Sequence, residues 1–255
     1  MNNYIMRCVL LGMVIFSFLS TGVSAGELSA ELHWSKRLVL STTVTGVVEK
    51  VLVSPGQSLK KGDTLLNLDA REFKAAVNLA SAKLLATKTV LDESKRELAR
   101  AQDLYDRTML SEHDLQVAKN NQSLAKAAYL GAKAALLKAR ISLDRSRIQS
   151  PFDSVVLDVM AQPGQTIISS VRIEPLAIIA EADRMIARAW LSLTDIKKYM
   201  SVKARQVSVS DNKFTVLSQN IAHEANEKGL YAMDVTFTTS DNDLRAGQVA
   251  SIIFP

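Results

Sequence analysis

The sequence predicts an α+β protein in which two similar β-halves form a small sandwich, a long antiparallel helical hairpin separates the halves, and a small β-barrel follows. Three observations predict this order. A strand-turn-strand pattern occurs twice at a constant offset, the stretch between the copies changes to a helical period, and the last third contains short strand-like segments. The low aromatic content of 5% also favours closely packed helices over a bulky enzyme core.

The first 25 residues have the features of a signal peptide. Arg7 supplies a positive charge, Val9 to Leu19 is apolar, and Val23-Ser24-Ala25 offers small residues for cleavage. An uncleaved membrane anchor is the alternative, although the apolar run is shorter than the roughly 20 residues that a spanning helix needs. Both interpretations place the rest of the chain outside the cytoplasm. Cys8, the only cysteine, lies in this segment, so we expect no disulfide and no thiolate metal site in the body.

Residues 47–59 and 155–167 are two copies of one pattern. Each copy has a β-branched run, a Pro-Gly pair and a second short run. Proline presets φ and glycine accepts the positive φ of a type II turn, so each copy predicts two strands joined by this turn. We expect the N-terminal strands and first half over 26–68, and the second half over 150–172, paired in one sandwich.

Residues 69–149 predict the hairpin, because no proline interrupts the chain between Gln57 and Ser150. Asp69 and Glu72 fit a capping box at the start of the first helix, and Ser111 is a favourable N-cap for the second. The turn is therefore expected between Thr108 and Ser111. Each arm of nearly forty residues would extend about 55 Å at 1.5 Å per residue.

Heptad spacing predicts one seam between the two helices. The first helix has apolar residues at Ala70, Val77, Leu84, Leu91, Leu98 and Tyr105. The second has the small series Ala118, Ala125, Ala132 and Ala139 beside Leu115, Gln122, Tyr129, Leu136 and Leu143. Large residues can therefore face small ones, which predicts close antiparallel packing.

Residues 173–255 predict the small β-barrel. Strand-like segments occur at 176–182, 185–192, 206–210, 214–217, 232–238 and 249–254, with a short helix at 195–200.

Charge and motifs argue against several classes of function. The net charge of +5 comes from alternating basic and acidic residues, which disfavours nucleic-acid binding. His33, His113 and His223 lie far apart without partners at ligand spacing, and no nucleophile-elbow, phosphate-loop or zinc-protease motif occurs. We expect no enzyme, no metal site and no cofactor.

Several segments, in order, resemble the periplasmic adaptor family, also called membrane fusion proteins, which includes HlyD-type and resistance-nodulation-division (RND) efflux adaptors. They are Val44–Val48, Val53–Asp63, Leu68-Asp69, Ser150–Val156 and Leu244–Gln248. Ser154 stands where the family's Pro-Phe-Asp-Gly usually has glycine. The resemblance implies a split lipoyl-like domain, a place in the periplasm at the inner membrane, and self-association, commonly as a hexamer.

The resemblance also implies two partners in a tripartite efflux or secretion system. Adaptors that dock on TolC-type outer-membrane channels carry an arginine, a leucine four residues later and a serine seven further, around the hairpin tip. Arg100, Leu104 and Ser111 match this spacing. The second partner would be an inner-membrane transporter of RND or ABC type, with RND favoured. The membrane-proximal domain that usually contacts it is expected to be absent or minimal.

Other interpretations stay open at this point. Without the resemblance, Arg100 is an ordinary solvated residue, Leu104 a seam residue and Ser111 a helix cap. The hairpin could serve a periplasmic scaffold with a different partner. A lipoyl or biotinyl carrier would need an exposed lysine at the tight turn between the β-halves, where this chain has the hairpin. The cargo and the energy source, proton or ATP, do not follow from the sequence.

Overall fold

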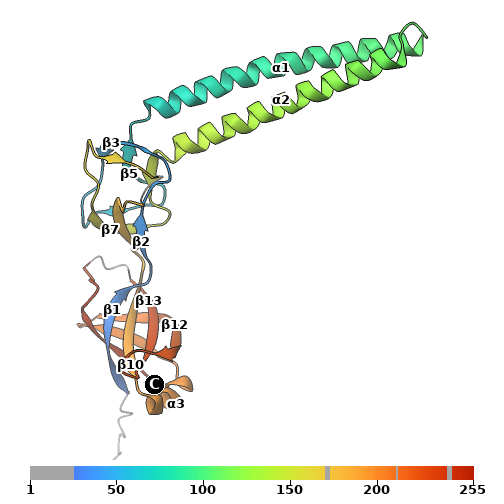
Figure 1. The fold of residues 1–255 in the computed structure, drawn as a ribbon. Coiled ribbons are helices and arrows are strands. Elements are labelled where there is room, and N and C mark those ends of the chain that lie inside the picture. Colours follow the sequence, from blue (N-terminus) through green and yellow to red (C-terminus); the bar gives the residue numbers. More distant parts are fainter. Residues whose placement is uncertain (1–25, 170–172, 211, 240–242) are drawn as a thin grey trace, which may run out of the picture. The chain divides into compact units, whose positions relative to one another are not determined.

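The computed structural model describes residues 26–169, 173–210, 212–239 and 243–255, so the predicted signal peptide at 1–25 lies outside the described residues. The chain divides into two compact units. One contains a β-sandwich and a helical hairpin, and the other a β-barrel (Figure 1). The predicted fold class is confirmed. Within the described ranges, no helix combines the length and apolar character needed to cross a membrane.

The sandwich consists of two four-stranded sheets that each combine strands from both sequence copies. One sheet has the order β2 (Arg37–Leu40), β9 (Ala177–Glu181), β7 (Ser154–Val159) and β4 (Ser58–Leu59). The other has the order β6 (Arg147–Gln149), β5 (Thr64–Leu68), β3 (Gly46–Val51) and β8 (Thr166–Ile167). Alternating residues of these strands point inward, so Leu65 lies in one apolar cluster and Leu66 in another, both fully buried.

The two copies of the repeat have matching hydrogen bonds. The Gly56 N–H donates to the Val156 carbonyl at 2.7 Å, and the Gly164 N–H donates to the Val48 carbonyl at 2.9 Å. The return bonds to the two glutamine carbonyls, from Val156 N–H to Gln57 and from Val48 N–H to Gln165, are both 2.9 Å. The glycine φ angles are 86° and 84°, as the predicted type II turns require. Each half therefore closes onto the other half, and the predicted pairing is confirmed.

The barrel repeats this turn in a third place. Gly247 has φ 90°, its N–H donates to the Leu32 carbonyl at 2.8 Å, and the Leu32 N–H returns a 2.9 Å bond to the Gln248 carbonyl. The Gln248 side chain accepts the Arg245 N–H at 3.0 Å, as the Gln57 side chain accepts the Ser54 N–H at 3.1 Å. A glutamine after the glycine thus holds the turn from inside in both domains.

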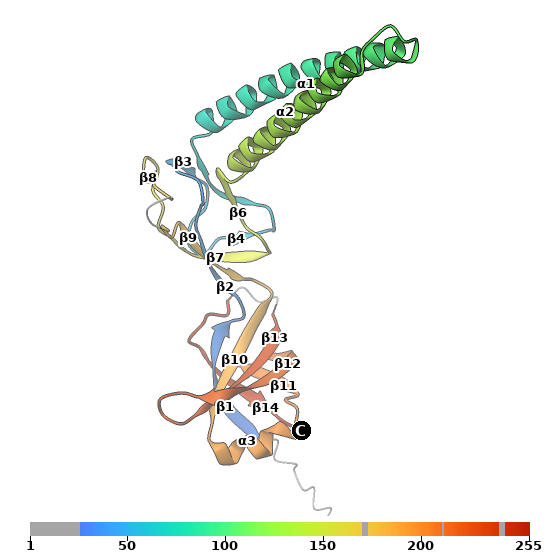
Figure 2. The ribbon, with the colours of Figure 1, turned by 45° about the vertical axis from the view of Figure 1, so that its right-hand side comes forward.

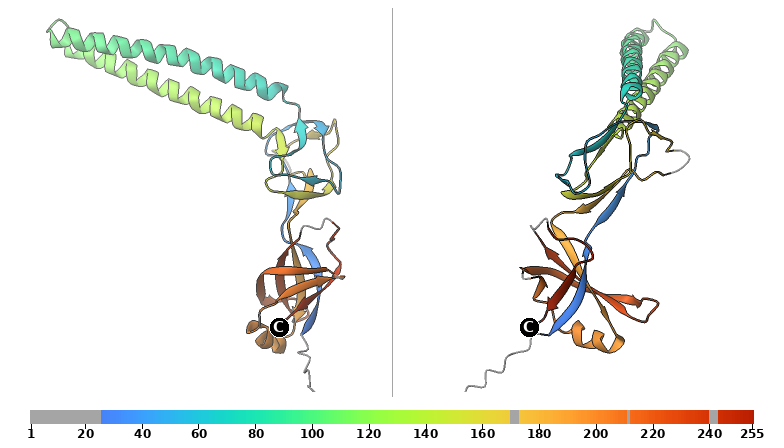
Figure 3. Two further views of the ribbon diagram at one scale, coloured as in Figure 1. Left: turned by 180° about the vertical axis from the view of Figure 1, so that it is seen from behind. Right: turned by 90° about the vertical axis from the view of Figure 1, so that its left-hand side faces the viewer.

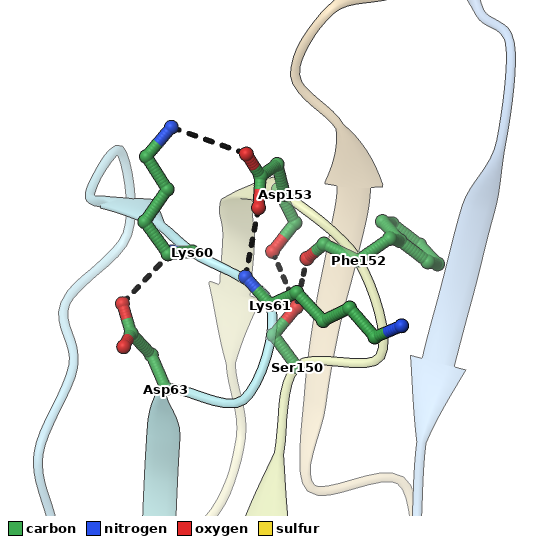
Figure 4. Close-up of polar contacts among 7 residues, drawn as sticks. Lys60, Lys61, Asp63, Ser150, Phe152 and Asp153 are labelled. Carbon is green, nitrogen blue, oxygen red and sulfur yellow. Dashed lines mark hydrogen bonds and ion pairs between the residues drawn. The ribbon is translucent and has the colours of Figure 1, made fainter.

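A fourth turn, Lys60 to Asp63, ties the first half to the segment that returns from the hairpin (Figure 4). The Asp153 carboxylate accepts the Lys61 backbone N–H at 2.8 Å and binds the Lys60 ammonium at 3.1 Å. These two contacts lower the pKa of the Asp153 carboxyl, the backbone bond contributing most. The link is solvent-exposed at Lys60, so its backbone part matters more than its ion pair.

Ser154, which stands where the adaptors that the sequence resembles usually have glycine, has a buried hydroxyl with a partner. The Ser150 hydroxyl donates to the Phe152 carbonyl at 2.6 Å, and the Ser150 and Ser154 oxygens are 2.8 Å apart. Since Ser150 uses its only proton on Phe152, Ser154 must be the donor in the second bond. The buried serine therefore carries no unsatisfied donor.

Helices α1 (Arg71–Asp106) and α2 (Glu112–Asp144) run side by side (Figures 1 and 3). The predicted seam of α2 is confirmed, because every predicted seam position is buried or half-buried and the positions between them, apart from Ser142, are exposed. At the end of α1 the prediction is wrong, since Tyr105 is 37% exposed whereas Leu104 is half-buried.

The predicted capping box at Asp69 is also wrong. The helix has Ala70 at its N-cap without a side-chain cap bond, and the Asp69 carboxylate accepts the Arg71 N–H at 3.0 Å and binds the Arg71 guanidinium. The Asp69 backbone N–H is held by the Val47 carbonyl at 2.8 Å, so Asp69 stays with the sandwich and the helix begins later. The Arg71 side chain, with its backbone N–H, lowers the pKa of the Asp69 carboxyl to about 2.

The barrel is closed by six strands and carries one short helix, α3 (Leu193–Met200), at one end (Figure 2). Its strands, in spatial order, are β1 (Glu27–Trp34), β10 (Arg184–Leu191), β13 (Tyr231–Thr238), β12 (Asn212–Ala225), β11 (Gln206–Val209) and β14 (Val249–Ile253). Fully buried side chains such as Met185, Met233 and Phe237 fill its interior.

Three features differ from the ranges expected for this region. Strand β1 belongs to the barrel although it precedes residue 173, and β9 pairs with β2 and β7 in the sandwich although it follows that residue. Strand β12 is much longer than the expected 214–217. Register shifts after Val216 and Ile221 break its alternation, so the sequence pattern indicates only part of the strand. The local pattern identifies a strand but not the partner with which it pairs.

Candidate functional site

The tip of the hairpin is a tight connection between α1 and α2. The Thr108 N–H donates to the Tyr105 carbonyl at 2.8 Å, and the Met109 N–H donates to the Leu104 carbonyl at 2.9 Å. These two bonds form a Schellman motif, which satisfies carbonyls at the end of a helix. The turn lies where the sequence predicted it, between Thr108 and Ser111.

Thr108 occupies the position of the motif that usually holds glycine. Its φ is 59°, a left-handed conformation that is strained for a β-branched residue. Its hydroxyl donates to the Arg107 carbonyl at 2.6 Å. The sequence offers no sign of this conformation, because threonine does not favour it.

Arg100 and Leu104 lie one helical turn apart on α1. The Arg100 side chain is 62% exposed and pairs with Glu97 at 2.9 Å, a surface ion pair that contributes little to stability. Leu104 is half-buried and its carbonyl belongs to the Schellman motif. Arg100 is six residues before the end of α1, about 9 Å at 1.5 Å per residue, so both residues belong to the last two turns.

Ser111 caps α2, as the sequence predicted. Its hydroxyl accepts the Asp114 N–H at 3.1 Å and donates to the Asp114 carboxylate at 2.6 Å. The oxygen retains one lone pair that could accept a bond from a partner. Ser111 is therefore a structural residue first, and any docking role must coexist with the cap.

Met109 is an exposed apolar side chain at the apex that the sequence did not single out. It is 72% exposed and follows the strained Thr108. In a Schellman motif the residue at this position usually packs on the one that occupies the place of Leu104. Together Arg100, Leu104, Met109 and Ser111 surround the end of the hairpin with a cation, two apolar groups and a hydroxyl.

The described residues contain no group of three or more His, Cys, Asp or Glu side chains that could hold a metal ion. An outward-open groove of about 640 Å³ starts behind the tip and runs between the helices, with Glu97, Ala101, Asp114 and Val117 among its lining residues. This composition suits contact with another helix better than binding a small polar substrate.

Residues 36–177, which span the sandwich and the hairpin, match the model of the CzcB-like barrel-sandwich hybrid domain. The chain belongs to the CzcB-like barrel-sandwich hybrid family. The resemblance to periplasmic adaptors that the sequence predicted is thereby confirmed.

Two curated relatives of this family member match part of it. The 36 kDa antigen of Helicobacter pylori strain J99 is 34% identical over 122 residues, which cover 48% of the chain and 35% of that protein. Multidrug resistance protein MdtA of Yersinia enterocolitica is 24% identical over 179 residues, which cover 70% of the chain and 40% of that protein. The match thus spans less than half the length of either relative.

Two solved structures share the fold of this CzcB-like chain. A MacA-MexA chimeric protein that contains the Pseudomonas aeruginosa MexA α-hairpin domain has a TM-score of 0.66 at 24% identity, covering 90% of the chain and 80% of the chimera. The membrane fusion protein Spr0693 from Streptococcus pneumoniae R6 has a TM-score of 0.69 at 19% identity, covering 91% and 99%. At such identities the likeness concerns the fold.

Proposed function

We propose that this chain is the periplasmic adaptor of a tripartite efflux or secretion system. Its hairpin tip would dock on an outer-membrane channel of TolC type, and its other end would work with an inner-membrane transporter, of RND type in preference to ABC type. The observation that carries the proposal is the tip itself, where the spacing of Arg100, Leu104 and Ser111 coincides with the bend between two helices of 36 and 33 residues. Membership of the adaptor family and relatives named as multidrug resistance proteins support it.

The tip has the chemistry expected of a helix-to-helix docking surface. Leu104 and Met109 provide apolar area that an incoming helix end can cover, while Arg100 is free to exchange its weak bond with Glu97 for a carbonyl or carboxylate of the channel. Carbonyls at the ends of the channel's helices would be natural acceptors for that guanidinium. The Ser111 hydroxyl can accept one further bond without leaving its cap.

The hairpin also exposes apolar side chains outside its own seam, which supports self-association as a hexamer. Leu79 is 73% exposed, Leu124 is 69% exposed and Leu137 is 59% exposed. Packing of neighbouring hairpins side by side would cover them. The proposed ring would place six tips against one channel.

Co-purification with the outer-membrane channel from cross-linked cells tests the docking. Leu104→Asp and Ser111→Arg should each abolish recovery of the channel and export, because one puts a charge on the apolar patch and the other a bulky cation at the bend. The matched controls are Leu84→Asp, at a half-buried site on α1 like that of Leu104 but far from the tip, and Ser123→Arg, at an exposed site on α2. Equal channel recovery from tip variants and controls would refute tip docking.

Ser111 needs a second variant because it is also a cap. Ser111→Asn keeps a good N-cap residue, whereas Ser111→Ala costs about 1 kcal/mol of helix stability. Loss of channel binding in Ser111→Asn with unchanged helicity would assign a docking role to the serine. Normal channel binding in that variant would leave Ser111 as a cap only.

The remaining alternatives have separate outcomes. A periplasmic scaffold with another partner would keep its complexes in the tip variants. A lipoyl or biotinyl carrier would show a mass increase on a lysine of the protein purified from cells, although the hairpin occupies the connection between the two β-halves where such a lysine would lie. Intact mass spectrometry decides that point.

A further inference from the structure

Helix α3 exposes an apolar and basic ridge at one end of the barrel. Leu193, Lys197 and Met200 follow each other at positions i, i+4 and i+7, so they line one side of the helix. Leu193 is 65% exposed and Met200 is 74% exposed. The opposite side is buried through Tyr199, whose ring lies 4.7 Å from that of Phe254.

Cations are concentrated in and just after this helix. Lys197, Lys198, Lys203 and Arg205 are all exposed, and residues 197–205 contain no acidic residue. The nearest carboxylate on the helix, Asp195, binds the hydroxyl of its own cap, Ser192, at 2.6 Å. Two exposed apolar side chains, with two lysines in the helix and two more cations just after it, suit contact with an anionic membrane surface.

The barrel holds α3 rigidly in this orientation. The Gln219 amide donates to the Tyr199 carbonyl at 3.0 Å and the Val202 carbonyl at 3.2 Å, and its oxygen accepts the Ala204 N–H at 2.7 Å. One side chain of β12 thus satisfies the carboxyl end of the helix. The ridge is presented without the entropy cost of ordering a free segment.

The same end of the barrel is where the described chain begins. The Phe254 N–H donates to the Gly26 carbonyl at 3.1 Å, and Phe254 is the residue whose ring packs on Tyr199 of α3. Figure 1 accordingly shows α3 beside the start of β1 and the carboxyl end of the chain.

We propose that α3 binds the surface of an anionic phospholipid membrane through Leu193, Met200 and the cations of residues 197–205. The two apolar side chains enter the headgroup region, and the lysines extend their ammonium groups to the phosphates. Each cation strengthens binding to such a surface by about fivefold. Because this attraction is electrostatic, salt weakens the contact. It orients the barrel end on the membrane independently of the hairpin tip.

Sedimentation with vesicles tests the proposal on the protein from Gly26 onward, which contains every described element. Vesicles of phosphatidylcholine with 30% phosphatidylglycerol should bind it, whereas pure phosphatidylcholine vesicles or 0.5 M NaCl should release it. Lys197→Glu with Lys198→Glu should weaken binding at least about 25-fold. Leu193→Gln with Met200→Gln should weaken it several-fold at unchanged charge.

The control makes the same charge change elsewhere on the barrel. Arg184→Glu with Lys213→Glu alters two exposed cations, one at the start of β10 and the other at the start of β12, and should retain binding. Near- and far-ultraviolet circular dichroism verifies that all variants are folded. Equal binding to neutral and anionic vesicles, or equal loss in the control, would overturn the proposal. Loss of a co-purifying transporter from the lysine variant with unchanged vesicle binding would overturn it too, because α3 would then be a protein contact.

Discussion

Replacing glycine with alanine at Gly131 and at Gly56 should have opposite effects on stability. Gly131 lies in the exposed interior of α2 with nothing within 4 Å of an added Cβ, so alanine should stabilise the protein by about 0.8–1.0 kcal/mol. Gly56 also has open space around an added Cβ, but its φ is 86°. An L-residue in that conformation costs about 1–2 kcal/mol, so the backbone alone decides the sign.

Gly164 provides an internal replicate. It has φ 84°, the same open space and the same pair of hydrogen bonds as Gly56. Gly56→Ala and Gly164→Ala should therefore destabilise by amounts that agree within about 0.5 kcal/mol. Gly56→Asn should recover part of the loss, because asparagine tolerates positive φ better than alanine.

Urea unfolding followed at 222 nm measures these differences. All three glycines lie in one compact unit, so they report on one body. Amide hydrogen exchange of Val48 and Val156, whose N–H groups bond across the two turns, measures the local effect in the sandwich. The reasoning is refuted if Gly131→Ala is not stabilising, or if the two turn variants are as stable as the parent protein.

Three further predictions concern single side chains. Gln219→Ala should lower the free energy of unfolding of the barrel by about 1–3 kcal/mol, because it leaves carbonyls at the end of α3 without donors. The control Asn220→Ala, at an exposed neighbour, should change it by no more than about 0.5 kcal/mol. Unfolding followed by tryptophan fluorescence measures both. The pKa of the Asp69 carboxyl is about 2 in the folded chain against 3.8 ordinarily, so the stability that its ionised form contributes is present above about pH 4 and is lost as the pH falls toward 2. In an NMR titration, Arg71→Ala should return this pKa toward its ordinary value. An unchanged titration curve would contradict the role of Arg71. Thr108→Gly should raise stability to urea by about 0.5–1 kcal/mol by removing left-handed strain, and a loss of stability would show that the threonine hydroxyl bond outweighs the strain.

The hairpin shows how far a periodic pattern can predict a structure. The seam of α2 was predictable at every position because seven-residue spacing alone decides which side chains share one face. The seam of α1 was predictable except at its end, where Leu104 is half-buried and Tyr105 is exposed. The true start of α1 was not predictable, since the Asp69 N–H donates to the Val47 carbonyl on a separate strand and Asp69 therefore does not cap the helix.

The candidate sites divide in the same way. Arg100, Leu104 and Ser111 were selected through the resemblance to channel-docking adaptors; Leu104 and Arg100 lie in the last two turns of α1, and Ser111 caps α2. Met109, which is 72% exposed, was not singled out by the sequence, and neither was the left-handed conformation of the preceding Thr108. The ridge on α3 was likewise hidden, since only the docking of Tyr199 on Phe254 decides which side of the helix faces solvent.

By itself, the sequence determined the repeat, the two turns that close the sandwich, the hairpin and its bend, because each depends on residues within a few positions of one another. Only the tertiary structure decided that β1 belongs to the barrel and that β9 belongs to the sandwich. Strands that look alike locally differ only in the distant partner whose hydrogen bonds and apolar face they complete. That choice is settled by the packing of the whole domain.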